Sequence, residues 1–155
     1  MTTTSPSRPA GSRYLLGPLR RPHRLVMAFA AFVAAAAHVP VIAPHLHEAP
    51  YMGVLFIVLT VACAALAVAV LVRDSVAIYA SAALTCGLAV IGYVATRLVA
   101  FPMLADDVGN WLEPLGVVSV VSETVVVLAA GAALRRPRSA PPSAPVRQVS
   151  RSARG

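Results

Sequence analysis

Three residues place ionisable side chains inside otherwise apolar stretches of this 155-residue chain: His38, Arg97 and Glu123. Ionisable groups in the hydrocarbon region of a membrane are costly and usually mark a functional site. Arg97 and Glu123 fall on consecutive apolar stretches, so we expect them to meet as an intramembrane ion pair or a proton site. A purely structural pair that only fixes helix register is the alternative.

Further imidazole and carboxylate groups lie in the two connections near these residues. These side chains are the usual ligands of transition metals, and zinc or copper would suit them. The candidate metal ligands are His38, His45, His47, Glu48 and Glu113, with Asp106 and Asp107 as an outer-loop acidic pair. Each histidine taken alone is more typical of a solvated loop residue, and only their common location favours a metal site.

Other chemistries have little support in the sequence. A haem needs an axial ligand inside the bundle, and His38 alone is placed to supply one, so haem binding is not expected. Hydrolase and nucleotide-binding motifs are absent from the chain. Cys63 and Cys86 fall near the middle of their apolar stretches and are interpreted as packing residues. We therefore expect a protein that is not an enzyme.

The elements that must position these residues are membrane-spanning helices. Hydrophobic residues make up 58% of the chain and charged residues 12%, well below the charged share of soluble domains. Four apolar stretches are long enough to cross a bilayer, at residues 24–43, 51–72, 75–100 and 115–134. The short connections predict an all-α, up-down-up-down four-helix bundle over residues 24–134. Residues 1–23 and 135–155 are predicted to be disordered cytoplasmic tails.

The distribution of arginine predicts the orientation of the chain. All 13 basic residues are arginine, and all except Arg97 lie before or at the start of the first stretch, between the second and third, or after the fourth. Because arginine near span ends stays on the cytoplasmic side, both termini are predicted to be cytoplasmic, in a multi-pass protein of the cell inner membrane. The same rule explains the net charge of +7 without a nucleic-acid partner.

Polar and small residues follow one side of the third and fourth stretches at helical spacing. We expect both stripes to face the bundle interior. They comprise Thr85, Gly92, Tyr93, Thr96 and Arg97 on the third stretch, and Gly116, Ser119 and Glu123 on the fourth.

Two features of the first stretch leave alternatives open. Pro40 removes a backbone hydrogen bond, so we expect a kink or unwinding near His38, followed by a loop over residues 43–50. The arginine-rich start, the apolar run and the alanines at 35–37 also fit a signal peptide cleaved after Ala37. Cleavage there would make His38 the new N-terminus, and its amino group and imidazole would then bind a metal together.

The polar residues described above, with nearby glycine, proline and phenylalanine residues, follow an order that resembles that of small four-helix integral membrane proteins of actinobacteria and other bacteria. No activity is assigned to that family. The resemblance covers about residues 25–134. Its pattern is His38, Pro44-His45-Leu46-x-Glu48, Gly53, Phe56, Arg97-x4-Pro102, Glu113-Pro114-x-Gly116 and Glu123. It implies a site made of His38, His45, Glu48, Arg97, Glu113 and Glu123. This chain differs by adding His47 and the Asp106-Asp107 pair.

These observations favour a membrane protein with an outward-facing pocket of histidines and carboxylates. The pocket would bind a metal ion or a small polar ligand, and the chain would act as an accessory subunit of a membrane complex. A small oligomeric transporter or proton-coupled permease using Arg97 and Glu123 is the second interpretation. A purely structural subunit is the third. Expected partners are the lipid bilayer and either further copies of the chain or a larger complex.

Overall fold

The computed structural model describes residues 21–73 and 75–135, and within them it is helical without strands. Most of both predicted tails lies outside these residues. The elements are α2 (Arg21–Glu48), α3 (Pro50–Val72), α4 (Val76–Leu98), the short 3₁₀ turn η1 (Ala105–Asp107) and α5 (Pro114–Arg135). Each of the four long helices is long and apolar enough to cross a membrane. The prediction of four apolar helices is therefore confirmed.

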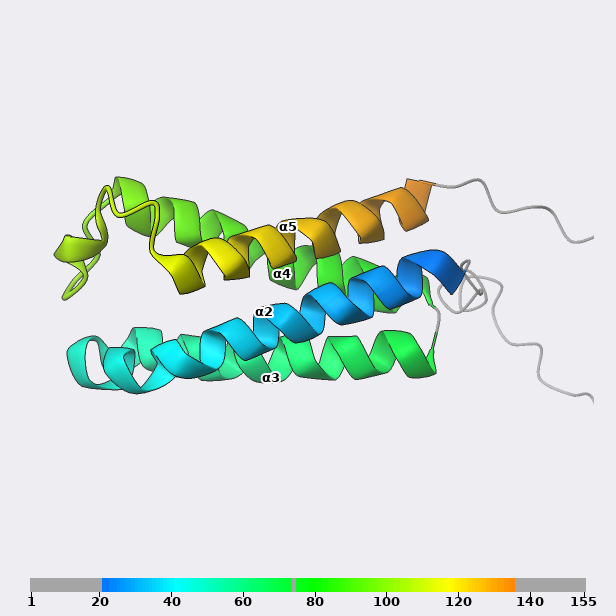
Figure 1. Ribbon diagram of the computed structural model, residues 1–155, viewed down its shortest axis with the longest axis horizontal. Helices are drawn as coiled ribbons and strands as arrows, with labels where there is room; N and C mark the ends of the chain where they lie inside the picture. The colour runs from blue at the N-terminus through cyan, green and yellow to red at the C-terminus, as the bar shows by residue number, and fades with distance from the viewer. Residues whose placement is uncertain (1–20, 74, 136–155) are drawn as a thin grey trace, which may run out of the picture.

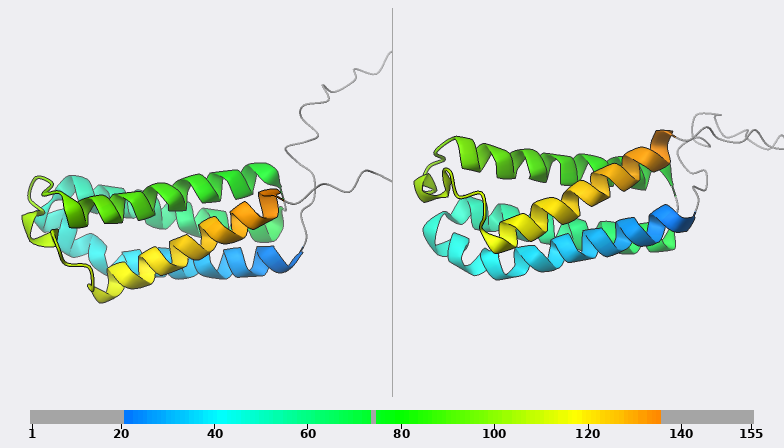
Figure 2. Two further views of the ribbon diagram at one scale, coloured as in Figure 1. Left: turned by 90° about the horizontal axis from the view of Figure 1, so that it is seen from above. Right: turned by 45° about the horizontal axis from the view of Figure 1, so that its top comes forward.

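The helices lie side by side along one long axis, and α2 begins at the end of the bundle where α5 finishes (Figure 1). The opposite end carries η1 and the α2–α3 connection, and we call it the η1 end. Helix α2 packs most extensively on α3 and also on α5, which packs on α4. Among these neighbouring pairs, α3 and α4 share the smallest interface. Helix α5 runs obliquely across the bundle (Figure 2). The bundle is thus most open between α3 and α4.

Local signals fix where the helices begin and end at the end opposite η1. The Ser75 hydroxyl accepts a hydrogen bond from the backbone N–H of Ile78 at 3.3 Å and caps the start of α4. Arg24 of α2 donates to the backbone carbonyls of Val70, at 2.9 Å, and Leu71 in the last turn of α3. A cation there is favourable because the last carbonyls of a helix carry partial negative charge. The Arg24 contacts tie α2 to α3 at this end, and the Ser75 cap fixes the start of α4.

Helix α2 is longer than the sequence suggested, and the predicted loop over residues 43–50 is wrong. The backbone stays helical through Pro40 and Pro44 to Glu48, without unwinding near His38, and Ala49 alone separates α2 from α3. Close packing on α3 supports the last turn, since a Cβ at Gly53 would lie 2.7 Å from the Leu46 backbone nitrogen. Neighbouring helices commonly compensate for proline in membrane helices.

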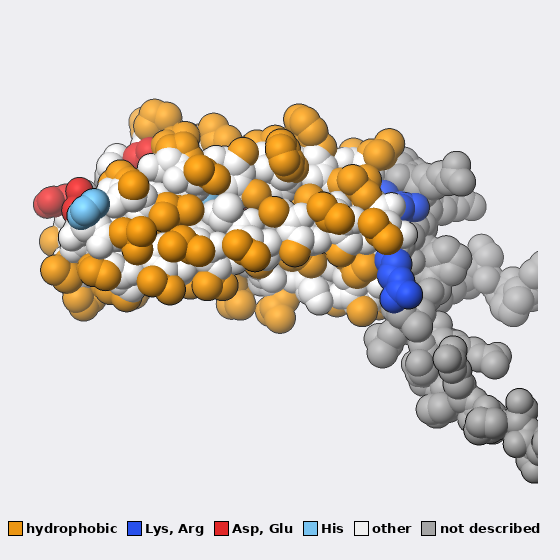
Figure 3. Space-filling view, turned by 90° about the horizontal axis from the view of Figure 1, so that it is seen from below, with side chains coloured by type: hydrophobic (Ala, Val, Ile, Leu, Met, Phe, Trp, Pro, Cys, Tyr) orange, Lys and Arg blue, Asp and Glu red, His pale blue; other side chains and the backbone are white. Residues whose placement is uncertain are grey.

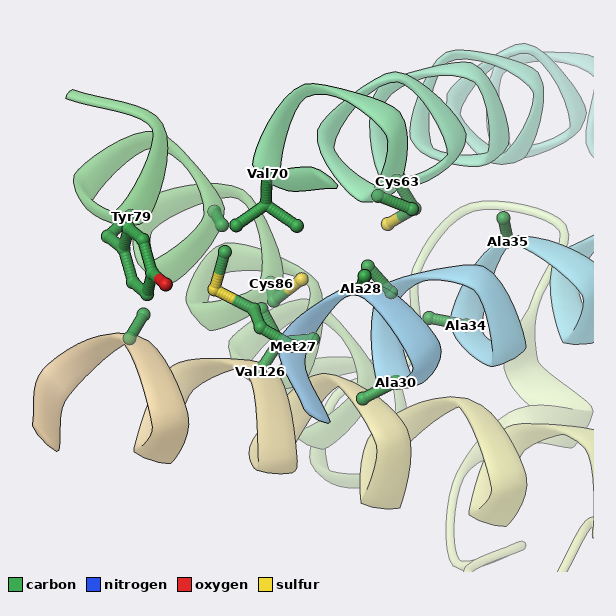
Figure 4. Close-up of a cluster of buried hydrophobic side chains, with 14 of the residues drawn as sticks. Met27, Ala28, Ala30, Ala34, Ala35, Cys63, Val70, Tyr79, Cys86 and Val126 are labelled. Carbon is green, nitrogen blue, oxygen red and sulfur yellow. The ribbon is translucent and has the colours of Figure 1, made fainter. Parts of the chain in front are cut away.

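The half of the bundle far from η1 is filled by one hydrophobic cluster (Figure 4). Small residues of α2 allow its neighbours to approach closely, and larger side chains such as Met27, Tyr79 and Val126 fill the remaining space. The thiols of Cys63 and Cys86 are fully buried and interact with each other in this cluster. Cleavage after Ala37 would remove six of its 15 buried residues, so the fold favours retention of the first helix.

The surface carries the pattern expected of a membrane-embedded protein. Large apolar side chains are exposed along all four long helices. In the space-filling view the charged side chains separate, with acidic and histidine side chains at the η1 end and arginine at the other (Figure 3). An apolar belt between two oppositely charged ends suits a multi-pass membrane protein.

Candidate functional site

His38 and Glu123 form a buried pair between α2 and α5. Their side chains approach with His38 Nε2 3.6 Å from Glu123 Oε1, and the residues are only 4% and 1% exposed. Each lies about 14–15 Å along its helix from the η1 end, at 1.5 Å per residue. The two groups therefore meet deep in the bundle, further in than the shorter predicted helices would have placed them.

The hydrogen bonding of His38 defines what this pair can do. Nδ1 lies 2.6 Å from the carbonyl oxygen of Ala34, and because a carbonyl only accepts, Nδ1 carries a hydrogen. Nε2 of a neutral ring is then an acceptor. A neutral imidazole and an ionised carboxylate would therefore face each other with two acceptors. Nε2 attracts the Glu123 carboxyl group only when the pair binds one more proton, on either the imidazole or the carboxyl group. The pair is thus suited to hold or release a single proton.

Arg97 binds a different carboxylate from the one we expected. Its Nη1 lies 2.7 Å from Asp107 Oδ1 and donates to the Asp107 carbonyl oxygen at 3.1 Å. The guanidinium carbon also sits 4.7 Å from the ring centroid of Tyr93. Arg97 thus pairs with the η1 turn, while Glu123 faces His38. A direct Arg97–Glu123 ion pair is not formed among the described residues.

The connection between α4 and α5 is held onto the bundle by hydrogen bonds. Tyr51 donates to the carbonyl of Pro102 at 2.7 Å, and Tyr93 donates to that of Trp111 at 2.9 Å. The backbone N–H of Gly109 donates to the Arg97 carbonyl at 3.0 Å, with a positive φ that glycine adopts without strain. These bonds fix Asp107 beside Arg97.

Glu113 caps the start of α5 with its side chain. One carboxylate oxygen accepts from the backbone N–H of Leu115 at 3.2 Å, and the other accepts from that of Gly116. A Cβ at Gly116 would lie 2.6 Å from Tyr93 Cε2, so glycine allows α4 to approach at this point. The contacts give this acid a structural role that the sequence analysis had missed.

The structure does not bring the predicted metal ligands into one site. His45 is half-buried, donates from Nδ1 to the Val41 carbonyl at 2.8 Å, and packs edge-on against Phe56. His47, Glu48 and Asp106 are exposed. Within residues 21–73 and 75–135, no three His, Cys, Asp or Glu side chains lie close enough together to hold a metal ion.

Four of the buried polar residues, His38, Arg97, Ser119 and Glu123, instead line a cavity of about 650 Å³ in the η1 half of the bundle. All eight residues of the two predicted polar stripes line it, and Gly92 among them is exposed. His38, His45, Asp107 and Glu113 contribute further polar groups. Most of the remaining wall is apolar and comes from α3 and α4. The volume is typical of a small-molecule site.

Two polar atoms of cavity-lining side chains lack a hydrogen-bond partner. Arg97 Nε and Glu123 Oε1 are buried and unbonded within the part of the chain that the structure describes. Unsatisfied buried donors and acceptors are rare in folded proteins because each costs about 1–3 kcal/mol. One offers a hydrogen and the other a lone pair, as expected of a binding site.

Sequence reasoning missed the apolar part of this site. Phe56 lies with its ring centroid 5.5 Å from that of His38 and 4.8 Å from that of His45, and so separates the two imidazoles. Leu59 and Ala89 also line the cavity. In a membrane helix, an apolar residue facing a cavity looks like one facing lipid. Because α2 continues through Pro40 and Pro44, His38 lies deeper in the bundle than the sequence suggested.

Comparison with known proteins adds no assignment: no protein-family model, curated protein or solved structure matches this chain. The resemblance to small bacterial four-helix membrane proteins therefore stays a prediction. The fold and the cavity are the observations on which function must be argued.

Proposed function

We propose that this chain is a non-enzymatic membrane protein that binds a small ligand in the cavity between its helices. The ligand contacts Arg97 and Glu123, and the His38–Glu123 pair supplies or accepts a proton as the ligand binds. The chain acts as a binding or accessory subunit in the membrane, alone, as a homo-oligomer or within a larger complex.

One observation carries this proposal: the unbonded Arg97 Nε and Glu123 Oε1 belong to side chains that line the same cavity. A purely structural bundle would gain stability by closing the cavity or by pairing these atoms. A ligand with complementary polar atoms satisfies both and fills the space. The separate pairing of Arg97 with Asp107 keeps the guanidinium fixed while Nε remains free to donate.

The proposed orientation places the η1 end on the outer face of the cell inner membrane, with both termini cytoplasmic. Arg24, Arg73 and Arg135 lie at the opposite end, where the positive-inside rule expects them. The helices then alternate in an up-down-up-down bundle. The cavity lies in the outer half, so its ligand arrives from the outside or from the outer leaflet.

The test is to identify compounds that stay with the protein after extraction from membranes in polymer nanodiscs, without a His-tag. Gly92 lines the cavity and is exposed, and nothing lies within 4 Å of a Cβ placed there, so Gly92→Phe would put a ring at the mouth of the cavity. Gly131→Phe is the matched control, since Gly131 also has free space but lies outside the cavity.

The extracts are analysed by liquid chromatography with mass spectrometry and by elemental analysis. We expect one compound at near-stoichiometric amount in the wild type and in Gly131→Phe, and a loss of at least tenfold in Gly92→Phe. Equal lipid profiles in all three proteins, without a specific compound, would contradict ligand binding. A stoichiometric metal would instead restore the metal site that the sequence suggested.

A proton-coupled permease is the second candidate, and the His38–Glu123 pair favours it. A protonatable pair deep in a membrane bundle is typical of proton-coupled transport. The tightly packed cluster between this pair and the arginine-rich end closes the path in the present conformation. Proton flux into reconstituted vesicles that contain a pH-sensitive dye would separate transport from binding alone. A flux in the wild type that is lost in Glu123→Gln would favour transport.

A further inference from the structure

The walls of the cavity divide into a polar end and an apolar mouth. Arg97, Asp107 and Tyr93 lie at the η1 end of the cavity, and His38 and Glu123 lie deeper on its α2–α5 side. The α3 wall and the adjoining Leu88 and Ala89 of α4 are apolar. A ligand that matches these walls has a polar head and an apolar chain.

The mouth opens toward lipid rather than toward water. Leu55 and Val58 of α3 and Leu88 of α4 line the cavity and are also 54%, 59% and 60% exposed. Leu88 lies near the middle of α4, at a depth where a spanning helix is surrounded by acyl chains. The opening coincides with the neighbouring pair of helices that share the smallest interface. An apolar chain can therefore enter from the bilayer without crossing water.

The charges at the polar end favour an uncharged head. Arg97 is already neutralised by Asp107 at 2.7 Å, and Glu113 is engaged with the N-terminus of α5. An anionic head would find no unpaired arginine among the described residues of the cavity, and a cationic head would compete with the proton that the His38–Glu123 pair holds. A hydroxyl group suits either unbonded atom, because its oxygen can accept from Arg97 Nε–H and its hydrogen can be donated to Glu123 Oε1; a head with two hydroxyl groups can serve both.

We propose that the ligand is a single-chain amphiphile with an uncharged, hydroxyl-bearing head, which enters the cavity from the membrane between α3 and α4. This inference rests on the proposed function and names its ligand class. A long-chain alcohol and a glycerol monoester share the required chemistry and differ only in the number of hydroxyl groups.

The test is photo-crosslinking of the full chain in phosphatidylcholine nanodiscs. The probes are hexadecanol, a hexadecyl glycerol monoester and hexadecanoic acid, each with a diazirine in the chain, and cross-linked residues are mapped by mass spectrometry. We expect both hydroxyl probes to label cavity-lining residues such as Leu59 and Ala89. Labelling should fall at least fivefold with excess unlabelled alcohol and in Gly92→Phe, but not in Gly131→Phe.

Three results would overturn the ligand class. The first is stronger labelling by the acid, which would show a charged head. The second is labelling spread evenly over lipid-facing residues such as Phe29 and Val121, unaffected by competitor. The third is a water-soluble compound found in the wild-type extract but lost in Gly92→Phe. That last result would leave the proposed function standing, whereas an extract without any bound compound would remove both.

If Gly92→Phe is poorly folded, competition by unlabelled alcohol in the wild-type protein still shows whether the hydroxyl probes bind specifically in the cavity. Comparison of the two hydroxyl probes identifies the head, since preference for the monoester indicates that more than one hydroxyl is bound. The Arg97→Lys variant keeps the charge but removes Nε as a donor, and it should weaken labelling by both hydroxyl probes two- to tenfold.

Discussion

The two halves of this bundle are built from the same apolar helices but are filled in opposite ways. In the half far from η1, alanines of α2 let the helices approach and one hydrophobic cluster fills the space. In the η1 half, α3 and α4 separate, aromatic and ionic contacts hold the α4–α5 connection, and a cavity of about 650 Å³ remains. The first half stabilises the fold, and the second leaves room for a ligand.

Polar residues follow the same division. In the packed half, Arg24 and Ser75 make contacts to the backbone that secure helix ends. In the η1 half, Arg97 and Glu123 are buried and each has an unbonded atom beside one cavity, whereas the unbonded His23 Nε2 of the other half does not line that cavity. The difference indicates that one set of polar groups serves the fold, while the other is available for binding. Paired substitutions, one in each half, test this comparison.

The largest effect is expected from Arg97→Met in the η1 half. It leaves Asp107 without its cation. Arg97 is buried but the Asp107 side chain is 25% exposed, so the loss should be smaller than for a fully buried pair, about 2.5 kcal/mol in the free energy of unfolding. The exposed Arg135, at the other end, is the control, and Arg135→Met should cost about 0.5 kcal/mol or less. Unfolding by SDS in mixed micelles measures both. Equal effects would contradict the role of the Arg97–Asp107 pair.

Substitution of alanine by leucine should separate the packed half from the cavity. Ala34 is fully buried among the core residues, so Ala34→Leu should destabilise the bundle by about 2 kcal/mol through overpacking. Ala89 lines the cavity, and Ala89→Leu should change the free energy of unfolding by about 0.5 kcal/mol or less. The same titration tests both. A large loss in Ala89→Leu would show that the cavity is closed.

Two glycines of α5 should respond to alanine with opposite signs. Gly116→Ala places a methyl group 2.6 Å from Tyr93 Cε2, and the repacking should cost about 1.5 kcal/mol. Gly131→Ala meets nothing within 4 Å and should stabilise the helix by about 1 kcal/mol. Thermal unfolding of the purified variants gives both signs. Stabilisation in both would mean that α4 and α5 do not approach at Gly116.

The smallest effect is expected from the cap of α5. Glu113→Ala removes two hydrogen bonds to the first turn and should cost about 1 kcal/mol. Glu48→Ala, at an exposed helix end, should be nearly neutral. If Glu113→Ala is also neutral but releases a stoichiometric metal, Glu113 is a ligand and the capping role is wrong.

The sequence was sufficient for the four apolar helices and for the two stripes that line the cavity, because periodicity and hydrophobicity determine both. The sequence did not predict which polar side chains pair with each other. Arg97 reaches Asp107 because Tyr51 and Tyr93 pin the connection to the bundle, and such long-range contacts have no local signal. The extension of α2 depends on Gly53, which lies on another helix. Local sequence rules therefore ended this helix at residue 43 rather than at Glu48.

The most direct measurement is an experimental density map of the full chain in lipid nanodiscs, from cryo-electron microscopy with a bound antibody fragment. The account predicts density for a non-protein molecule between α3 and α4, within hydrogen-bond distance of Arg97 Nε and Glu123 Oε1. A bundle in which α3 and α4 close together and Arg97 pairs directly with Glu123 would contradict it.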